Sequence, residues 1–348
     1  MSTDLYIMAS PLQALNAMEA RAVFPAASAI AVLVESVSSA GNAQLRSIVE
    51  SENWKEIRTI TVHPGRFRKH YANVADVLAF LSRVAFGRLF IGFYDDIFLH
   101  FAHSVAHNEL FLLDDGVATI SLNQARVGNS NRVLPVPAWK QLARRCILRV
   151  ADGMRTSPID TLRYFTIYDR LTQDSRNLIQ THSMERLRSR RAMTSQNDEV
   201  WLLGLGSERI FKSQDLYVSA IERIVRNWLP SPVRYLPHRY ESPGQVELIR
   251  QRTGAEILHT GMPVELYLVQ SRTVPAAVCS LISSALYTVG VLFPDIIRIV
   301  AYRMNFQQIR RRYHGQFGLI YRYYEDTPFI QVLNADAPSA GPEQVYAA

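Results

Sequence analysis

The sequence has little cysteine and no pattern typical of a secretion signal. Only two cysteines occur among 348 residues. Cys146 and Cys279 both lie in apolar surroundings, which predicts buried free thiols rather than a disulfide and fits a reducing cytosol. A signal peptide is not expected, because Asp4 interrupts the start of the chain and the apolar stretch Leu5–Ala9 is too short.

Long hydrophobic runs are also scarce. The uncharged run Ala276–Phe293 reaches about the length that marks a membrane-spanning helix. It carries several serines as well as Thr288 and Gly290, however, and Pro294 ends it. A buried strand, a tight loop and the start of a helix therefore fit this segment better than a transmembrane helix.

Several functional signatures are incomplete or absent. Gly204-Leu205-Gly206-Ser207 follows a predicted strand, but Arg209 stands where a dinucleotide fingerprint needs its third glycine, which argues against a nicotinamide oxidoreductase. The segment is better interpreted as a loop that approaches a nucleotide closely.

His103 and His107 are four apart in a predicted helix but lack the glutamate of zinc proteases, so we expect packed or surface histidines and no metal site. No DNA- or RNA-binding signature is present.

Acidic residues are outnumbered, with 31 Asp and Glu against 38 Lys and Arg and a net charge of +7. A positive net charge favours binding to anionic partners but does not identify them. The excess is clustered in two arginine-rich stretches, at 186–191 and 310–312. The hydrophobic fraction of 48% is typical of a globular protein, and the length predicts two domains.

Strand and helix signals alternate along both halves of the chain. Continuous apolar runs such as Ile30–Glu35 predict strands covered on both faces, and the alternation predicts an α/β fold with doubly wound parallel sheets. The expected parts are an N-terminal Rossmann-like domain (1–171), an interdomain connection (172–198), a C-terminal Rossmann-like domain (199–304), a basic amphipathic helix (305–334) and a flexible tail (335–348).

Two short polar motifs follow predicted strands, one in each half. Asp114-Asp115-Gly116 comes directly after Leu110–Leu113, and Pro237-His238-Arg239 comes after Val233–Leu236. Ligands of open α/β sheets bind at the carboxyl ends of strands, so these motifs are candidate site residues. Each also has a plain structural interpretation, since Asp-Gly favours a turn and a lone histidine is usually structural.

A serine pair, Ser283-Ser284, lies between a predicted strand and a predicted helix. Serine is a preferred residue at a helix N-cap. This interpretation is compatible with a phosphate site, because the free N–H groups of a helix N-terminus attract anions.

Taken in order, these motifs resemble those of the bacterial sialyltransferases with a GT-B fold, in particular the lipooligosaccharide sialyltransferase and capsule polysialyltransferase group. The family's acidic motif, Asp/Glu-Asp/Glu-Gly, matches residues 114–116, and its serine pair matches residues 283–284. Its His-Pro motif is present in altered order at residues 237–239, where proline precedes histidine. The opening segment Ala9–Gln13 looks like the family's first strand-to-helix turn.

The resemblance implies two Rossmann-like domains that face each other across a cleft, and a single inverting displacement at the anomeric carbon of CMP-sialic acid, with neither metal nor cofactor. It implies that Asp114 is the general base and that Asp115 orients or tunes it, although the assignment between the two stays open. It implies that His238 protonates or hydrogen-bonds the departing phosphate, as an imidazolium stabilised by that phosphate. The remaining expected contacts are Gly206, Ser207, Pro237, Arg239, Ser283 and Ser284 on the donor side, and Ser10 and Gln13 on the acceptor side.

Two alternatives stay open. The altered order at residues 237–239 also fits a transferase of another CMP-activated 2-keto sugar, such as Kdo. A non-catalytic basic protein that binds acidic polymers would keep the arginine clusters but would have no need for paired aspartates. The expected partners are a CMP-sugar and a glycan acceptor, without nucleic acid; the acceptor, the linkage and the oligomeric state are not specified by the sequence.

The C-terminal segment adds an expectation about location. Apolar residues recur at spacings of three and four from Phe306 to Tyr321, and Arg310, Arg311 and Arg312 flank them. Such a helix either packs on the domains or lies in an anionic membrane interface. With the resemblance, this predicts a protein of lipopolysaccharide or capsule biosynthesis in the bacterial cytoplasm, held peripherally at the inner face of the cytoplasmic membrane.

Overall fold

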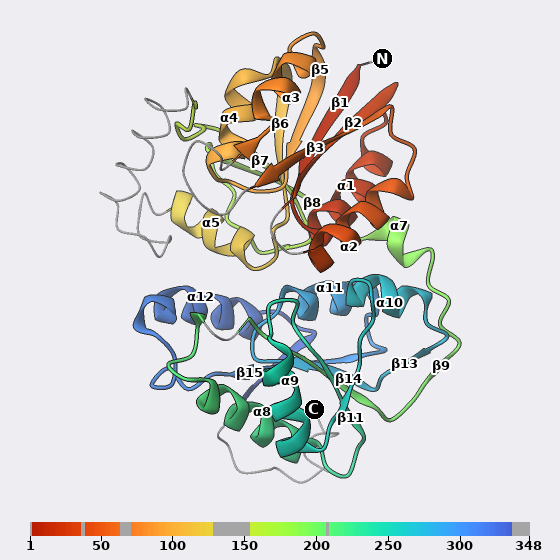
Figure 1. The fold of residues 1–348 in the computed structure, drawn as a ribbon, viewed down its shortest axis with the longest axis vertical. Helices are drawn as coiled ribbons and strands as arrows, with labels where there is room; N and C mark the ends of the chain where they lie inside the picture. Colours follow the sequence, from red (N-terminus) through yellow and green to blue (C-terminus); the bar gives the residue numbers. More distant parts are fainter. Residues whose placement is uncertain (1, 36–38, 63–70, 128–153, 207–208, 336–348) are drawn as a thin grey trace. The chain divides into compact units, whose positions relative to one another are not determined.

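Two parallel β-sheets organise the chain (Figure 1). The computed structural model describes residues 2–35, 39–62, 71–127, 154–206 and 209–335. The chain divides into two compact units, Met1–Arg186 and Leu187–Ala348. Each unit has its own sheet, with helices connecting most of the successive strands.

The first unit contains an eight-stranded sheet in the order β4-β3-β2-β1-β5-β6-β7-β8. All neighbouring strands in it are parallel except β3 and β4. Its strands are β1 Thr3–Met8, β2 Ser28–Glu35, β3 Glu56–Val62, β4 Tyr71–Ala72, β5 Phe86–Ile91, β6 His107–Leu113, β7 Leu162–Thr166 and β8 Asn177–Thr181. Its helices are α1 Pro11–Val23, α2 Ser39–Glu50, α3 Val74–Leu81, α4 Asp96–Ser104 and α5 Ala118–Val127.

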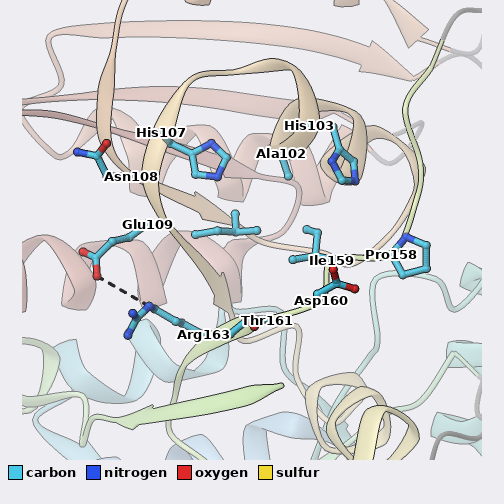
Figure 2. A pocket seen from close by; sticks show the side chains of 11 residues that line it. Ala102, His103, His107, Asn108, Glu109, Pro158, Ile159, Asp160, Thr161 and Arg163 are labelled. Carbon is cyan, nitrogen blue, oxygen red and sulfur yellow. Dashed lines mark ion pairs between the residues drawn. The ribbon is translucent and has the colours of Figure 1, made fainter. Parts of the chain in front are cut away.

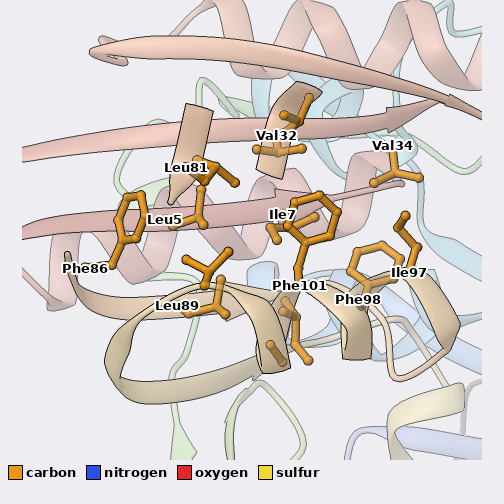
Figure 3. Close-up of a cluster of buried hydrophobic side chains, with 14 of the residues drawn as sticks. Leu5, Ile7, Val32, Val34, Leu81, Phe86, Leu89, Ile97, Phe98 and Phe101 are labelled. Atoms are coloured by element: carbon orange, nitrogen blue, oxygen red, sulfur yellow. The ribbon is translucent and has the colours of Figure 1, made fainter. Parts of the chain in front are cut away.

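Both faces of this sheet are covered, which explains why its central strands are continuously apolar. Leu5 and Ile7 of β1 point to one face, where Phe98 and Phe101 of α4 complete a buried cluster (Figure 3). On the other face Tyr6 stacks on Phe90 of β5, with 4.4 Å between ring centroids. Alternate residues of one strand thus enter two separate cores, so a polar substitution at either position would be buried.

The second unit contains a six-stranded parallel sheet in the order β12-β11-β10-β14-β15-β16. Its strands are β10 Val200–Leu203, β11 Val233–Leu236, β12 Glu256–Ile257, β14 Ala277–Ser280, β15 Arg298–Arg303 and β16 Ile330–Asn334. Its helices are α8 Gln214–Trp228, α9 Pro243–Thr253, α10 Val264–Gln270, α11 Ser284–Leu292, η3 Arg311–Tyr313 and α12 His314–Glu325. The short strands β9 Ser195–Gln196 and β13 Thr273–Val274 pair separately, and α7 Glu185–Arg188 spans the boundary between the units.

The two sheets share one topology, and it confirms the expected α/β fold with two Rossmann-like domains. In each, the first strand lies inside the sheet, the next two strands extend to one side and the later strands to the other. The order β3-β2-β1-β5-β6-β7 in the first unit corresponds to β12-β11-β10-β14-β15-β16 in the second, which is the order 3-2-1-4-5-6 of dinucleotide-binding folds. The order reverses between β1 and β5 and again between β10 and β14, and ligands of such sheets bind at this switch point.

Two expected boundaries differ from the structure. The segment 172–198 is not a connection throughout, because β8 within it pairs with β7 in the first sheet. The segment 305–334 is not one helix, since α12 begins only at His314 and β16 joins the second sheet beside β15. Both strands were missed because their apolar runs are short. Of the expected tail, only Ala335 lies within the described residues.

The apolar residues of the C-terminal segment are used within the second unit. Phe317 and Tyr321 on α12 are buried, as is Ile309 before it. The Tyr321 hydroxyl donates to the Leu281 carbonyl oxygen at 2.8 Å, which ties α12 to the chain between β14 and α11. The apolar stripe therefore packs on its own domain, whereas the side chains of the three arginines at 310–312 remain exposed.

No helix among the described residues is long and apolar enough to cross a membrane. The uncharged run at 276–293 folds as β14, a turn and α11, as expected from its serines.

Candidate functional site

The first switch point is built around Gln13. Ser10 is the N-cap of α1, and its hydroxyl oxygen accepts the Gln13 N–H at 3.3 Å. The Gln13 side chain is buried, its Oε1 accepting the Ala9 N–H at 2.6 Å and its Nε2 donating to Asp115 Oδ1 at 2.7 Å. A Cβ on Gly92, which follows β5, would lie 2.2 Å from Gln13 Oε1. The glycine thus makes room for a side chain that joins the β1 turn to the β6 turn.

Asp114 follows β6 directly and is a fully buried carboxyl group. Its Oδ1 accepts the Thr166 hydroxyl and its Oδ2 accepts the Ile167 N–H, both at 2.7 Å. These hydrogen bonds favour the ionised form, but burial dominates and raises the pKa of Asp114 to about 7. The group can therefore exchange a proton near neutral pH, but both oxygens already have protein donors.

Asp115 is only partly exposed, yet it is the more accessible of the two carboxyl groups. Its backbone N–H donates to the Thr119 hydroxyl at 3.0 Å, which fixes the turn into α5. Gly116 next to it has a φ of 63°, a backbone conformation that favours glycine. The motif is therefore both a turn, as Asp-Gly suggests, and a pair of carboxyl groups with different surroundings.

The second switch point brings the loop after β10 against the turn after β11. A Cβ on Gly206 would lie 3.3 Å from His238 Nδ1, so this loop approaches the imidazole ring closely. Pro237 and His238 are partly buried and Arg239 is exposed. The structure thus brings Gly206 and His238 together, and Ser207 lies outside the described residues.

His238 is a neutral imidazole in this environment. Burial, the larger cause, and the positive charge of Arg239 together lower its pKa to about 4. Its Nδ1 accepts the Tyr240 N–H at 3.4 Å, which leaves Nε2 as the protonated nitrogen. An imidazolium, as the sequence led us to expect, would require an anion bound beside the ring.

The serine pair begins α11 on the opposite side of the switch point. Ser283 is the N-cap, and its hydroxyl oxygen accepts the Ala285 N–H at 3.2 Å. Ser284 is the first helical residue, and both side chains are partly exposed. Ser280 at the end of β14 donates to the Leu203 carbonyl oxygen at 3.0 Å, which joins β14 to β10. The N-terminus of α11 thus lies at the sheet edge where anions bind in folds of this type.

Sequence reasoning missed Glu241, which is central to the second switch point. Its carboxylate accepts the His238 N–H at 2.7 Å and the Gln245 side-chain amide at 2.8 Å. The Tyr235 hydroxyl also donates to it, at 2.7 Å. A glutamate close to the start of a helix is usually exposed to solvent and interacts with the helix dipole. Only the tertiary structure shows that this one faces inward.

A cavity of about 420 Å³ lies elsewhere in the first unit (Figure 2). It opens at the amino ends of β6 and β7, the sheet edge opposite to Asp114. His103 and His107 line it, but His103 belongs to α4 and His107 to β6, so the expected common helix was wrong. His103 Nε2 lies 2.8 Å from the Ser157 carbonyl oxygen. Among the described residues, no group of three or more His, Cys, Asp or Glu is arranged to hold a metal ion.

Comparisons with known proteins find resemblance only in structure. No protein-family model and no curated protein sequence matches the chain. A UDP-N-acetylglucosamine 2-epimerase is similar with a TM-score of 0.48 and 9% identity, over 94% of this chain and 88% of that one. Arabidopsis thaliana UGT89C1 complexed with UDP is similar at 0.47 and 11%, over 98% and 88%. E. coli ADP-heptose lps heptosyltransferase II is similar at 0.35 and 12%, over 87% and 85%. Because these scores are below 0.5, the fold assignment stands on the strand order of the chain itself.

Proposed function

We propose that the protein is an inverting glycosyltransferase that transfers a CMP-activated 2-keto sugar, foremost sialic acid, to a hydroxyl group of a glycan. The observation that carries the proposal is the chemistry of the two switch points. One presents a pair of carboxyl groups, and the other presents a glycine loop, a histidine and a helix N-terminus. A base and an anion site are the two parts that this reaction needs.

On the acceptor side, Asp115 takes the proton from the attacking hydroxyl. The sequence resemblance implies that Asp114 is the general base but leaves the choice between the two aspartates open. Because Asp114 is buried and both of its carboxyl oxygens accept hydrogen bonds, Asp115 is the better candidate for the base. Gln13 orients Asp115 through the 2.7 Å hydrogen bond to Oδ1. Asp114, with a pKa raised to about 7, tunes the basicity of this pair.

On the donor side, the acceptor oxygen attacks the anomeric carbon while the bond from that carbon to the phosphate oxygen breaks. The electron pair leaves with CMP, and the configuration at the carbon inverts. His238 donates from Nε2 to the departing phosphate, and the phosphate's own charge raises the pKa of the ring so that a proton can follow. Ser283, Ser284 and the N–H groups of α11 stabilise the remaining negative charge.

The ordered motifs of the resemblance favour CMP-sialic acid, and CMP-Kdo is the alternative donor. A monophosphate leaving group can be stabilised by hydroxyls, an imidazole and helix N–H groups, so the proposed reaction needs no metal. A peripheral position at the inner face of the cytoplasmic membrane belongs to the same proposal, because acceptors of lipopolysaccharide and capsule synthesis are lipid-linked. The exposed arginines at 310–312 support it through charge alone.

A donor screen tests the proposal directly. The purified full-length protein is incubated with CMP-sialic acid, CMP-Kdo, UDP-N-acetylglucosamine or NAD in the presence of a glycan array, and CMP release and array labelling are measured. We expect transfer from one CMP-sugar and none from UDP-N-acetylglucosamine. Thermal-shift scans with CMP, NAD and an oligonucleotide are the binding control. Stabilisation by the oligonucleotide but not by CMP would contradict the proposal and favour a non-catalytic polyanion-binding protein.

A further inference from the structure

Glu241 joins the loop after β10, at the second switch point, to the turn after β11. It lies between the β11 turn and α9, and it exchanges two hydrogen bonds with His238. The Glu241 N–H donates to the His238 carbonyl oxygen at 2.8 Å, and the His238 N–H donates to Glu241 Oε2 at 2.7 Å. A Cβ on Gly204 would lie 2.2 Å from the same Oε2. The carboxylate therefore packs directly against the backbone of the loop that follows β10.

A chain of hydroxyl groups extends from Glu241 to the glycine loop. Tyr235 has one hydroxyl hydrogen, which it donates to Glu241 at 2.7 Å. Its oxygen lies 2.8 Å from the Tyr217 hydroxyl, so Tyr217 must be the donor in that pair. The Tyr217 oxygen in turn accepts the Leu205 N–H at 2.9 Å. Burial raises the pKa of both tyrosines well above the ordinary value, so both remain protonated donors.

We propose that Glu241 is a positioning residue that fixes the glycine loop and His238 in one arrangement for nucleotide binding. The inference rests on the proposed function, and Glu241 itself touches no substrate in it. Each hydrogen bond in the chain has a single direction, from the Leu205 amide through Tyr217 and Tyr235 to Glu241. Loss of the carboxylate leaves the His238 N–H and the Tyr235 hydroxyl without their acceptor, which permits the loop and the imidazole to move apart.

Three variants separate this role from a merely stabilising one. Glu241→Gln keeps the size of the side chain but replaces one acceptor with a donor. Tyr235→Phe cuts the hydroxyl chain and leaves the carboxylate in place. Glu247→Gln is the matched control, because Glu247 lies on α9, is exposed and pairs with neighbouring residues of that helix, Arg250 and Gln251.

The readouts are steady-state transfer kinetics, CMP affinity, and hydrogen–deuterium exchange of the full-length protein, all measured well below each melting temperature. We expect Glu241→Gln to lower kcat/KM and CMP affinity at least tenfold, with faster exchange at the Leu205 and His238 amides. Tyr235→Phe should speed exchange at Leu205 more than at His238, and Glu247→Gln should match the wild type. If the Glu241→Gln protein is too unstable to measure, the exchange rates and kinetics of Tyr235→Phe test the inference instead.

A folded Glu241→Gln protein with wild-type kinetics and wild-type exchange at both amides would overturn the inference, even if its melting temperature falls. The exchange measurement does not depend on transfer. If the wild-type protein transfers no sugar, the proposed function fails, while unchanged exchange in the variants would refute the positioning role separately.

Discussion

The two units share one strand order, but their switch points carry opposite chemistry. In the first unit the turn after the fifth Rossmann strand, β6, supplies carboxyl groups, and buried donors such as Thr166 and Ile167 surround one of them. In the second unit the turns after β10, β11 and β14 supply glycine, histidine and a serine N-cap. The first edge therefore carries carboxyl groups, whereas the second carries an imidazole ring and the N-terminus of a helix.

The difference shows that a common topology decides where a site forms but not what it does. In both units the strand order brings the ends of nonconsecutive strands together at one edge. The chemistry comes from the few residues placed there by short turns. Gln13 serves the first edge and Glu241 the second, each as the polar side chain that joins two of these turns.

The largest expected effect tests the chemistry of the first edge. Asp115→Asn should lower turnover by roughly two to four orders of magnitude, the usual range for loss of a general base. CMP affinity should change little, because the substitution lies outside the donor site. Turnover is measured under saturating donor with CMP release as the signal. Near-normal turnover in both Asp115→Asn and Asp114→Asn would remove the carboxyl groups from the mechanism.

The second edge is tested through its anion site. Combined Ser283→Ala and Ser284→Ala should weaken CMP binding at least tenfold, since hydrogen bonds to a charged group contribute about 1.5–3 kcal/mol each. Ser213→Ala is a matched control, because Ser213 is also a helix N-cap, for α8. Isothermal titration with CMP and with cytidine separates the phosphate contribution from that of the nucleoside. Equal losses for both ligands would contradict a phosphate site.

The pH dependence of stability distinguishes the two edges further. The pKa of Asp114 is raised from 3.8 to about 7, so the folded state binds this proton more tightly than the unfolded state. Its contribution to stability is therefore present at low pH and is lost as the pH rises from about 4 to 7, by up to about 1.4 kcal/mol for each pH unit. Denaturant unfolding of the wild type and of Asp114→Asn at several pH values measures this. Parallel pH profiles for the two proteins would refute the raised pKa.

A further expected effect concerns the exposed arginines of the second unit. Replacing Arg310, Arg311 and Arg312 with glutamine should reduce co-sedimentation with anionic liposomes at low salt, at about 1 kcal/mol for each arginine near the surface. Arg250→Gln is the control, because that guanidinium already pairs with Glu247. High salt should abolish binding of the wild type. Binding that ignores lipid charge and salt would exclude an electrostatic association.

The sequence by itself determined the α/β class, most of the strands and the local turns. The bounds of β11 follow from an apolar run that ends before Pro237, and Ser283 is the N-cap that the serine pair indicates. These features depend on neighbours within a few residues, which a sequence displays directly. Short strands such as β8 and β16 were missed because their pairing partners, rather than their own composition, stabilise them.

The tertiary structure alone decided which ionisable groups are buried and what they contact. The sequence could not rank Asp114 against Asp115, because the donors to Asp114 are at positions 166 and 167 and reach it only through strand pairing. It likewise placed the C-terminal apolar stripe in either a core or a membrane, and the burial of Phe317 and Tyr321 within the second unit decided for the core. The inward orientation of Glu241 likewise depends on contacts among β10, β11 and α9, which only the tertiary structure brings together. Burial and long-range hydrogen bonds set the pKa values and the orientation of these side chains. The spacing of residues along the sequence does not show which groups are buried or which distant groups they contact.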